Sequence, residues 1–361
     1  MSAFAIPAGV LERVRAECAA IGAPDAVELI TGRAALLGLG TPTRVSCGGA
    51  SRILQGIDGW CALTLSRGED LDAVGALLES DVSGDPWQAV TEAVAARSTV
   101  DVVERARLLD IPAAVLGEVP ASDPVITERQ PGVARPMDQL LVVDLSSMWA
   151  GPLCGKLLAD AGATVVKVES PDRPDGTRAG NPAFFDWVNG GKLSFAVSFG
   201  SAELLALLET ADVVIEASRP AALARHGLGP QHIPGRPGRV WVRISGYGPD
   251  FPHRVAFGDD AAVAGGLVVD STDGPMFCGD AIADPLTGIT ATAAVLEALQ
   301  TGGGSVIDIS MAGVAASYAA TGGDAVTVRA QAPKPPAPPA RPLGADNDHV
   351  RALVETRLAA C

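Results

Sequence analysis

The sequence predicts an α/β protein, with a Rossmann-like parallel sheet in a large domain and a small α+β domain joined to it. Two observations carry this prediction. Apolar strands alternate with helical segments from Leu140 onward, which is the pattern of parallel strands joined by right-handed helical crossovers. Before that region, residues 1–118 carry helical patterns around one clear strand, and a proline-rich stretch follows them.

The composition agrees with a globular α/β chain and limits its partners. The 361 residues suffice for two domains and a large core, and 48% hydrophobic residues with 41 glycines are typical of folded protein. The net charge of -15 argues against nucleic acid and against an anionic membrane, because both require a basic face. A polyanionic ligand would therefore require local clusters of arginine.

Cysteine and histidine spacing indicates neither a metal site nor a disulfide framework. The six cysteines are scattered without a CxxC pair, and the four histidines show no HExxH spacing. The start "MSAFAIPAGVLERVRAEC" lacks the basic and apolar regions of a signal peptide, and no apolar run approaches the length of a membrane span. We expect a cytoplasmic protein.

The first part of the chain predicts a small α+β domain over residues 1–118. Helical patterns occupy residues 9–22 and 85–110, and a strand is expected over Gly59–Ser66. Residues 119–139 are rich in proline and charge without periodicity, so they are interpreted as a linker.

The large domain is predicted over residues 140–322. Its strands and helices are expected, in order, at residues 140–147, 151–162, 163–170, 202–211, 212–220, 239–248, 304–311 and 312–323. No GxGxxG motif follows the first strand, so the sequence lacks the main evidence for binding of a nicotinamide cofactor. Residues 323–361 are expected to form a proline-rich, extended arm and a terminal helix.

The stretch "GDAIADPLTG" places two acids, Asp280 and Asp284, in apolar surroundings. Asp284 precedes a proline, which is welcome at the first position of a helix, so Asp284 is predicted to be the N-cap of a helix over Pro285–Gln300. Capping by itself implies no function. Asp280 is interpreted as a solvated loop acid.

The stretch "VVDLSSMWAGPLCGKLLADAGATVVKVESPDRPDGTR" resembles the opening of the class III coenzyme A transferases, the CaiB/BaiF family, and the likeness continues in register to about Ala320. This resemblance implies an acyl-CoA:carboxylate CoA-transferase. It places the catalytic acid at Asp284, four residues before Gly288. A carboxylate there would attack the thioester, form a mixed anhydride and then carry coenzyme A as a thioester. Asp280 is the rival for this role.

The resemblance also implies that coenzyme A or acyl-CoA is bound as substrate and that no cofactor is held tightly. Its expected contacts are Trp149, Ala150, Gly151, Lys167, Arg173, Arg178, Arg219 and Arg225. One departure concerns Ser198, Phe199 and Gly200, which stand where the family has an acid, an apolar residue and a base. Another places Phe257 or Gly258 where the racemase branch has a histidine.

Two alternatives stay open at this point. The first is an acyl-CoA racemase or isomerase that uses Asp284 with Asp259 or Asp260 as its two bases. The second is a non-catalytic acyl-CoA-binding subunit.

The order of the domains and the assembly follow from the same resemblance. The segment that resembles the family's small domain comes first in this chain, whereas it follows the first half of the large domain in typical members. The order of the domains is therefore interpreted as circularly permuted. An intertwined homodimer is implied, and the linker and the proline-rich arm are segments long enough to wrap around a partner.

Overall fold

The computed structural model describes residues 2–218, 223 and 225–359. Its centre is a sheet of six parallel strands in the order β8-β7-β6-β9-β10-β13, which confirms the predicted Rossmann-like sheet. The strands are β6 (Leu141–Asp144), β7 (Thr164–Glu169), β8 (Leu193–Ala196), β9 (Val213–Glu216), β10 (Val240–Ser245) and β13 (Ser305–Ser310). Each of them that was predicted lies inside its predicted segment.

This strand order is doubly wound, because the chain builds outward from β6 in one direction and from β9 in the other. In such sheets a crevice opens beyond the carboxyl ends of the two central strands, where their connections diverge, and ligands bind there. The segments that leave this point are residues 145–149 after β6 and the chain beyond Glu216 after β9.

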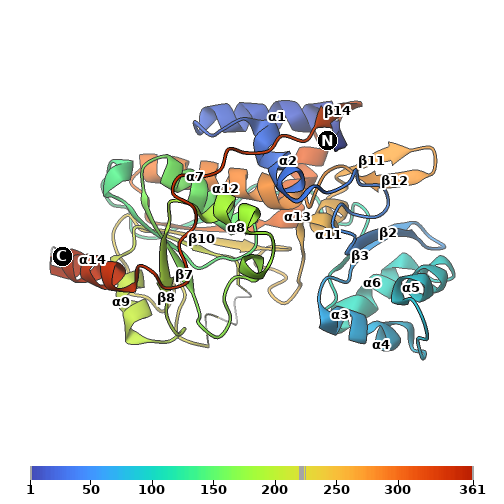
Figure 1. Ribbon diagram of the computed structural model, residues 1–361, viewed down its shortest axis with the longest axis horizontal. Coiled ribbons are helices and arrows are strands. Elements are labelled where there is room, and N and C mark those ends of the chain that lie inside the picture. Colours follow the sequence, from blue (N-terminus) through green and yellow to red (C-terminus); the bar gives the residue numbers. More distant parts are fainter. Residues whose placement is uncertain (1, 219–222, 224, 360–361) are drawn as a thin grey trace.

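Helices cover both faces of the sheet (Figure 1). On one face lie α7 (Ala150–Asp160), α12 (Ala283–Gln300) and α13 (Met311–Ala319), with α8 (Pro182–Asn189) beside α7; on the other lie α9 (Ala202–Thr210) and α14 (Asn347–Ala359). Side chains of β6 alternate between the two cores: Val142 packs on the first face, and Leu141 and Val143 pack on the second.

The N-terminal segment is a departure from the predicted domain of residues 1–118. Strand β1 (Ala3–Pro7) pairs antiparallel with β14 (Ala325–Arg329), and helices α1 (Ala8–Ala20) and α2 (Ala26–Leu37) lie over α12 and α8 (Figure 1). Their apolar side chains belong to the core of the large domain. Residues 3–37 therefore form a layer of the large domain, because their apolar stripe is buried against its helices.

A smaller body follows within residues 51–115. Its antiparallel sheet contains β2 (Ser51–Gln55), β3 (Trp60–Thr64) and β4 (Ala113–Val115), and the predicted strand at Gly59–Ser66 contains β3. Helices α3 (Gly68–Asp72), α4 (Val74–Leu78), α5 (Pro86–Ala95) and α6 (Thr99–Leu108) cover one face. The other face packs on α11 (Gly258–Ala264) and the hairpin of β11 (Val268–Ser271) and β12 (Gly274–Phe277).

The predicted linker also differs from expectation, because part of it forms an edge strand. Strand β5 (Val125–Glu128) pairs antiparallel with β13, and a 3₁₀ turn at Met137–Gln139 leads into the sheet. After β14, the arm runs extended along α2 and α8, where the Gln331 N–H donates to Thr31 Oγ1 over 3.0 Å. None of the described helices is long and apolar enough to cross a membrane.

Candidate active site

The helix that contains Asp284 begins earlier than predicted. Ile282 already has helical backbone angles and occupies the N-cap position, and α12 starts at Ala283. Asp284 is therefore the second residue of the helix and makes no capping hydrogen bond, so the predicted N-cap role is wrong. The chain enters the helix through Ala281, whose φ of 43° lies in the left-handed region that non-glycine residues seldom adopt. This turn presents Asp284 at the carboxyl edge of the sheet.

The Asp284 carboxyl is half-buried and close to the backbone of α11. A Cβ added to Gly258 would lie 2.3 Å from Asp284 Oδ2 and 2.3 Å from the carbonyl oxygen of Ala281, so only glycine fits there. Burial raises the pKa of Asp284 to about 7; the charge of Arg33 opposes this shift, whereas Asp259 and Asp280 add to it. At neutral pH the group thus exchanges readily between acid and carboxylate.

Asp280 forms a buried ion pair with Arg33, so the prediction of a solvated loop acid is wrong. Its side chain is 2% exposed, and Arg33 Nη1 donates to its Oδ1 over 2.5 Å. Its Oδ2 is buried without a partner among the described residues. Burial raises the pKa of Asp280 and Arg33 opposes that rise. Asp280 is therefore held in place by Arg33 and is enclosed, while Asp284 faces outward to a greater extent.

Asp259 and Asp260 tie the smaller sheet to α11. Asp259 accepts hydrogen bonds from Ser51 Oγ and from the Ala281 N–H, each over 3.0 Å. Asp260 is fully buried and accepts from Thr64 Oγ1 over 3.1 Å. Burial raises the pKa of Asp259 to about 6 and that of Asp260 to about 7. Asp259 thus connects β2 with the turn that precedes Asp284, and Asp260 connects β3 with the start of α11.

The start of α7 forms the opposite wall of the site. Trp149 is 3% exposed and packs edge-on against Phe184, with ring centroids 5.5 Å apart. Ala150 and Gly151 are buried in the first turn. Gly288 lets α12 approach this turn, because a Cβ there would lie 2.8 Å from the Ala150 carbonyl oxygen. The structure therefore brings the turn of Trp149, Ala150 and Gly151, which follows β6, beside the first half of α12.

A buried network of charges shapes the loop before Trp149. Lys192 Nζ lies 2.9 Å from Asp144 Oδ2, and Asp144 Oδ1 accepts from the Ser146 N–H over 3.0 Å. Lys167 Nζ lies 2.8 Å from Asp175 Oδ2 and also donates to the Ser146 carbonyl oxygen. These contacts hold the turn that follows β6.

Lys167 is thereby a correction to the expected coenzyme contacts. Its side chain is 2% exposed, and its ammonium is occupied by Asp175 and the backbone. Burial alone would lower the pKa of Lys167, but Asp144 and Asp175 raise it above its ordinary value. In this structure Lys167 supports the loop instead of presenting its charge to a phosphate.

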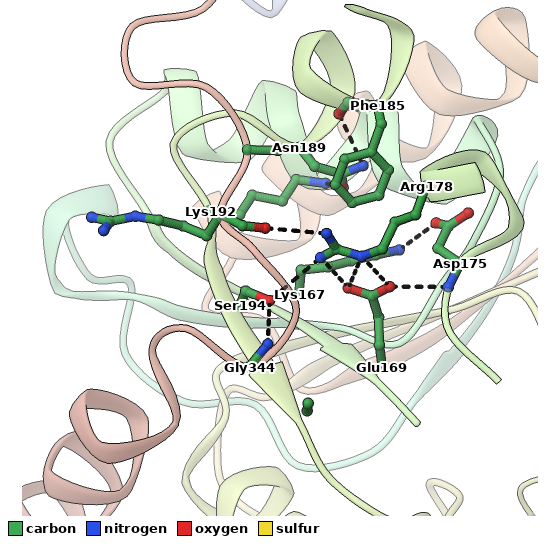
Figure 2. A network of polar contacts seen from close by, with 12 residues as sticks. Lys167, Glu169, Asp175, Arg178, Phe185, Asn189, Lys192, Ser194 and Gly344 are labelled. Atoms are coloured by element: carbon green, nitrogen blue, oxygen red, sulfur yellow. Dashed lines mark hydrogen bonds and ion pairs between the residues drawn. The ribbon is translucent and has the colours of Figure 1, made fainter. Parts of the chain in front are cut away.

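Arg178 is a second correction, and Figure 2 shows its guanidinium directed at Glu169. Arg178 Nη2 lies 2.6 Å from Glu169 Oε2, and its Nε lies 2.8 Å from Oε1. The bidentate pairing that was expected with a phosphate is therefore made with the Glu169 carboxylate. The same group stacks on Phe185 at 4.2 Å and donates to the Arg341 carbonyl oxygen in the arm. Arg178 therefore joins the arm to β7.

Three predicted contacts remain to be placed. Arg173 is exposed in the loop after β7, and Arg225 is exposed in the segment after β9. Arg219 lies outside the described residues. Arg33 was not predicted: a single arginine in an N-terminal helix carries no local signal, and its proximity to Asp280 arises only when α2 packs beside α12.

Comparison with known proteins gives matches to one family. The sequence model of "CoA-transferase family III" matches residues 137–345. The succinate–glutarate CoA-transferase of Agrobacterium fabrum is 34% identical over 208 residues, covering 50% of this chain and 52% of that protein. A probable fatty acyl-CoA transferase of Mycobacterium tuberculosis is 37% identical over 144 residues, covering 36% of each chain. The chain thus spans about half the length of the first of these relatives.

A solved CaiB/BaiF family protein from Brucella suis is 30% identical, with a TM-score of 0.46, covering 51% of this chain and 55% of that one. The family model matches more than half of the chain and includes the parallel strands, the start of α7 and Asp284. This chain belongs to CoA-transferase family III.

Proposed function

We propose that the protein is an acyl-CoA:carboxylate CoA-transferase in which Asp284 is the nucleophile. The observation that carries the proposal is the position of Asp284 in the first turn of α12, beside the Trp149 turn and at the crevice of the sheet. Membership of the family and relatives named as CoA-transferases support it.

The reaction needs a carboxylate that can be acylated. The Asp284 carboxylate attacks the thioester carbonyl carbon, the C–S bond breaks, and coenzyme A leaves as a thiolate with a mixed anhydride on Asp284. The thiolate then attacks the aspartyl carbonyl and releases the donor acid, leaving a thioester on Asp284. The acceptor carboxylate attacks that thioester, and the released thiolate attacks the new acyl carbonyl, which regenerates Asp284.

The start of α12 suits this chemistry. The N–H groups of a first helical turn and the helix dipole favour a carboxylate and can stabilise an oxyanion, whereas burial opposes ionisation. Both influences meet at Asp284, whose pKa lies at about 7. A carboxylate with this pKa is a better nucleophile than an ordinary aspartate and is still present at neutral pH.

The contacts of the neighbouring acids favour transfer over the racemase or isomerase alternative. Both oxygens of Asp259 accept hydrogen bonds, and Asp260 is fully enclosed. These contacts disfavour either acid as a second base, and Phe257 or Gly258 stands where the racemase branch of the family has a histidine.

The remaining coenzyme contacts belong to this proposal. Trp149, Ala150 and Gly151, at the start of α7, are proposed to line the coenzyme channel, and Arg173 and Arg225, both on exposed segments, are proposed to contact the phosphates of coenzyme A. Coenzyme A is treated as a substrate, with no tightly bound cofactor.

A homodimer is a further part of the proposal, and light scattering in solution tests it. The permuted order of the domains stays a prediction, because the family match covers residues 137–345 and leaves residues 1–118 unassigned.

Mass spectrometry of the intact protein tests the proposed function. After incubation with a mixture of acyl-CoA thioesters, we expect an adduct that hydroxylamine removes and that maps to the peptide containing Asp284. Binding of acyl-CoA without an adduct or turnover, over a broad panel of acids, would instead indicate a binding subunit. Deuterium entering the acyl chain in deuterated water, without an acceptor acid, would indicate an isomerase.

Gly258→Ala is expected to reduce transfer by about 100-fold, because the added Cβ displaces the Asp284 carboxyl and the Ala281 carbonyl by a large part of an ångström. Steady-state rates with a donor and an acceptor found active in the panel measure this effect. Gly68→Ala in α3 is the matched control, since nothing lies within 4 Å of its added Cβ. Full activity of Gly258→Ala would show that this contact does not position Asp284.

A further inference from the structure

Arg33 reaches the site from outside the segment that matches the family. It lies on α2, and the two residues that precede Arg33 both hold α2 in place. Gly32 packs so closely against the Trp187 ring that an added Cβ would lie 2.8 Å from its Cη2 atom. On the preceding residue, Thr31 Oγ1 accepts from the Gln331 N–H in the arm. The base of the Arg33 side chain therefore has a defined position over the site.

The guanidinium of Arg33 lies between an acid and an aromatic wall. Its Nη1 is 2.5 Å from Asp280 Oδ1, and its carbon is 5.6 Å from the Trp149 ring centroid and 5.7 Å from that of Phe184. The Arg33 side chain is 26% exposed, whereas that of Asp280 is 2% exposed. One group thus contacts both walls that flank Asp284.

The titratable groups whose ionisation the charge of Arg33 affects are three acids and one thiol. They are Asp259 at the start of α11, Asp280 in the turn before α12, Asp284 in the first turn of α12 and the Cys47 thiol. The charge of Arg33 favours the ionised form of each of them. Without a cation, neighbouring carboxylates oppose the ionisation of one another.

We propose that Arg33 is a positioning residue of this site: from α2 it holds the Asp280 carboxylate and the Trp149 ring in place beside the first turn of α12, which carries Asp284. This inference rests on the proposed function, because an ionised Asp284 matters only for a nucleophile. It assigns to the N-terminal segment a supporting part in the site of the family-like domain. Removing the charge leaves Asp280 buried without a counter-ion and Asp284 beside two other acids.

The experiment is a titration of Asp284 that does not depend on turnover. Protein labelled with ¹³C at the aspartate carboxyl carbons is titrated by NMR, and the signal absent from Asp284→Asn identifies the group. We expect a midpoint near 7 in the unaltered protein. In Arg33→Gln the midpoint is expected to rise by about one pH unit or more, and in Arg33→Lys it stays close to that of the unaltered protein.

A higher pKa of Asp284 predicts slower formation of the acyl-enzyme at neutral pH. Since attack requires the carboxylate, a rise of one pH unit in the Asp284 midpoint should make Arg33→Gln form the acyl-enzyme about 5-fold more slowly at pH 7, and the rate should recover as the pH rises. Arg33→Met is a second neutral variant that lacks a donor for Asp280, whereas Gln keeps one. Arg15→Gln, an exposed change on α1, is the matched control and is expected to move neither quantity.

The outcomes separate this inference from the proposed function. An unmoved Asp284 midpoint in Arg33→Gln, even with a lower Tm, would show a structural role only and overturn the inference. Retained transfer in Asp284→Asn would overturn the proposed function, while the midpoint would still report on Arg33.

Discussion

Asp284→Asn is expected to lower CoA transfer by about 1,000-fold or more, because the amide keeps the shape of the side chain but cannot form the anhydride. Transfer is measured with the donor and acceptor that the panel identifies. The hydroxylamine-sensitive adduct is expected to disappear in the same variant. A variant that retains a tenth of the activity, or that still carries the adduct, would remove Asp284 from the nucleophile role.

Asp284→Asn should lose CoA-transfer activity without becoming less stable. The folded pKa of Asp284, about 7, lies above its ordinary value of 3.8, so the folded state binds a proton that the unfolded state releases between these values. Stability from this group is therefore present at low pH and falls as the pH rises through 7. Asp284→Asn removes the free-energy cost of burying an ionised carboxylate, and its Tm at pH 8 is expected to equal or exceed that of the unaltered protein.

The matched control for Asp284→Asn is Asp273→Asn, in the exposed turn between β11 and β12. The chemical change is identical, but the carboxyl is outside the site. Its transfer rate and Tm are expected to remain those of the unaltered protein. A comparable loss in the control would indicate a general sensitivity to the removal of an acid.

Lys192→Met is expected to give the largest loss of stability, about 3–5 kcal/mol in the free energy of unfolding. Lys192 is 1% exposed, and besides Asp144 its ammonium contacts the Pro152 carbonyl oxygen and the Asn189 side chain. The change leaves the buried Asp144 carboxylate without its closest counter-ion. Urea unfolding followed by tryptophan fluorescence at neutral pH measures the loss.

The pH dependence and a double variant identify the cause. Burial would raise the pKa of Asp144, but Lys192 and Lys167 hold it below its ordinary value. Stability from this pair is therefore present above the ordinary pKa of an aspartate and is lost as the pH falls through the folded one. The deficit of Lys192→Met should narrow in acid, where Asp144 is protonated.

In Asp144→Asn with Lys192→Met, both charges are absent, and the amide oxygen can still accept from the Ser146 N–H. This double variant is expected to be more stable than Lys192→Met alone. Equal or lower stability of the double variant would assign the loss to packing instead of an unpaired charge.

Much of the fold could be predicted from local patterns. The apolar strands of the large domain stand alone between helical segments, and each of those predicted appears within its predicted residues. Such strands are buried on both faces, so their signal does not depend on a particular neighbour. The antiparallel strand β5 was missed, because all four of its residues are exposed and it is recognisable only by its pairing with β13.

The assignment of residues 3–37 depended on packing. Helical patterns identify an apolar stripe but not the surface that buries it. In the structure Val10 of α1 and Leu29 of α2 enter the core shared with α12, which lies at the far end of the sequence. The predicted first domain was therefore divided by a contact that no local segment specifies.

The candidate site shows the same division. The local sequence indicated an acid at the start of an apolar helix over Pro285–Gln300, and the structure places Asp284 in the first turn of that helix; the roles of Asp284 and of the 149–151 turn came from the family resemblance and stay predictions. The ion-pair partners of the cations could be known only from the tertiary structure. Lys167 pairs with Asp175, Arg178 pairs with Glu169, and Arg33 of the distant helix α2 pairs with Asp280. The reason is physical, because a side chain's charge is visible in the sequence, but its counter-ion depends on which elements the folded core brings together.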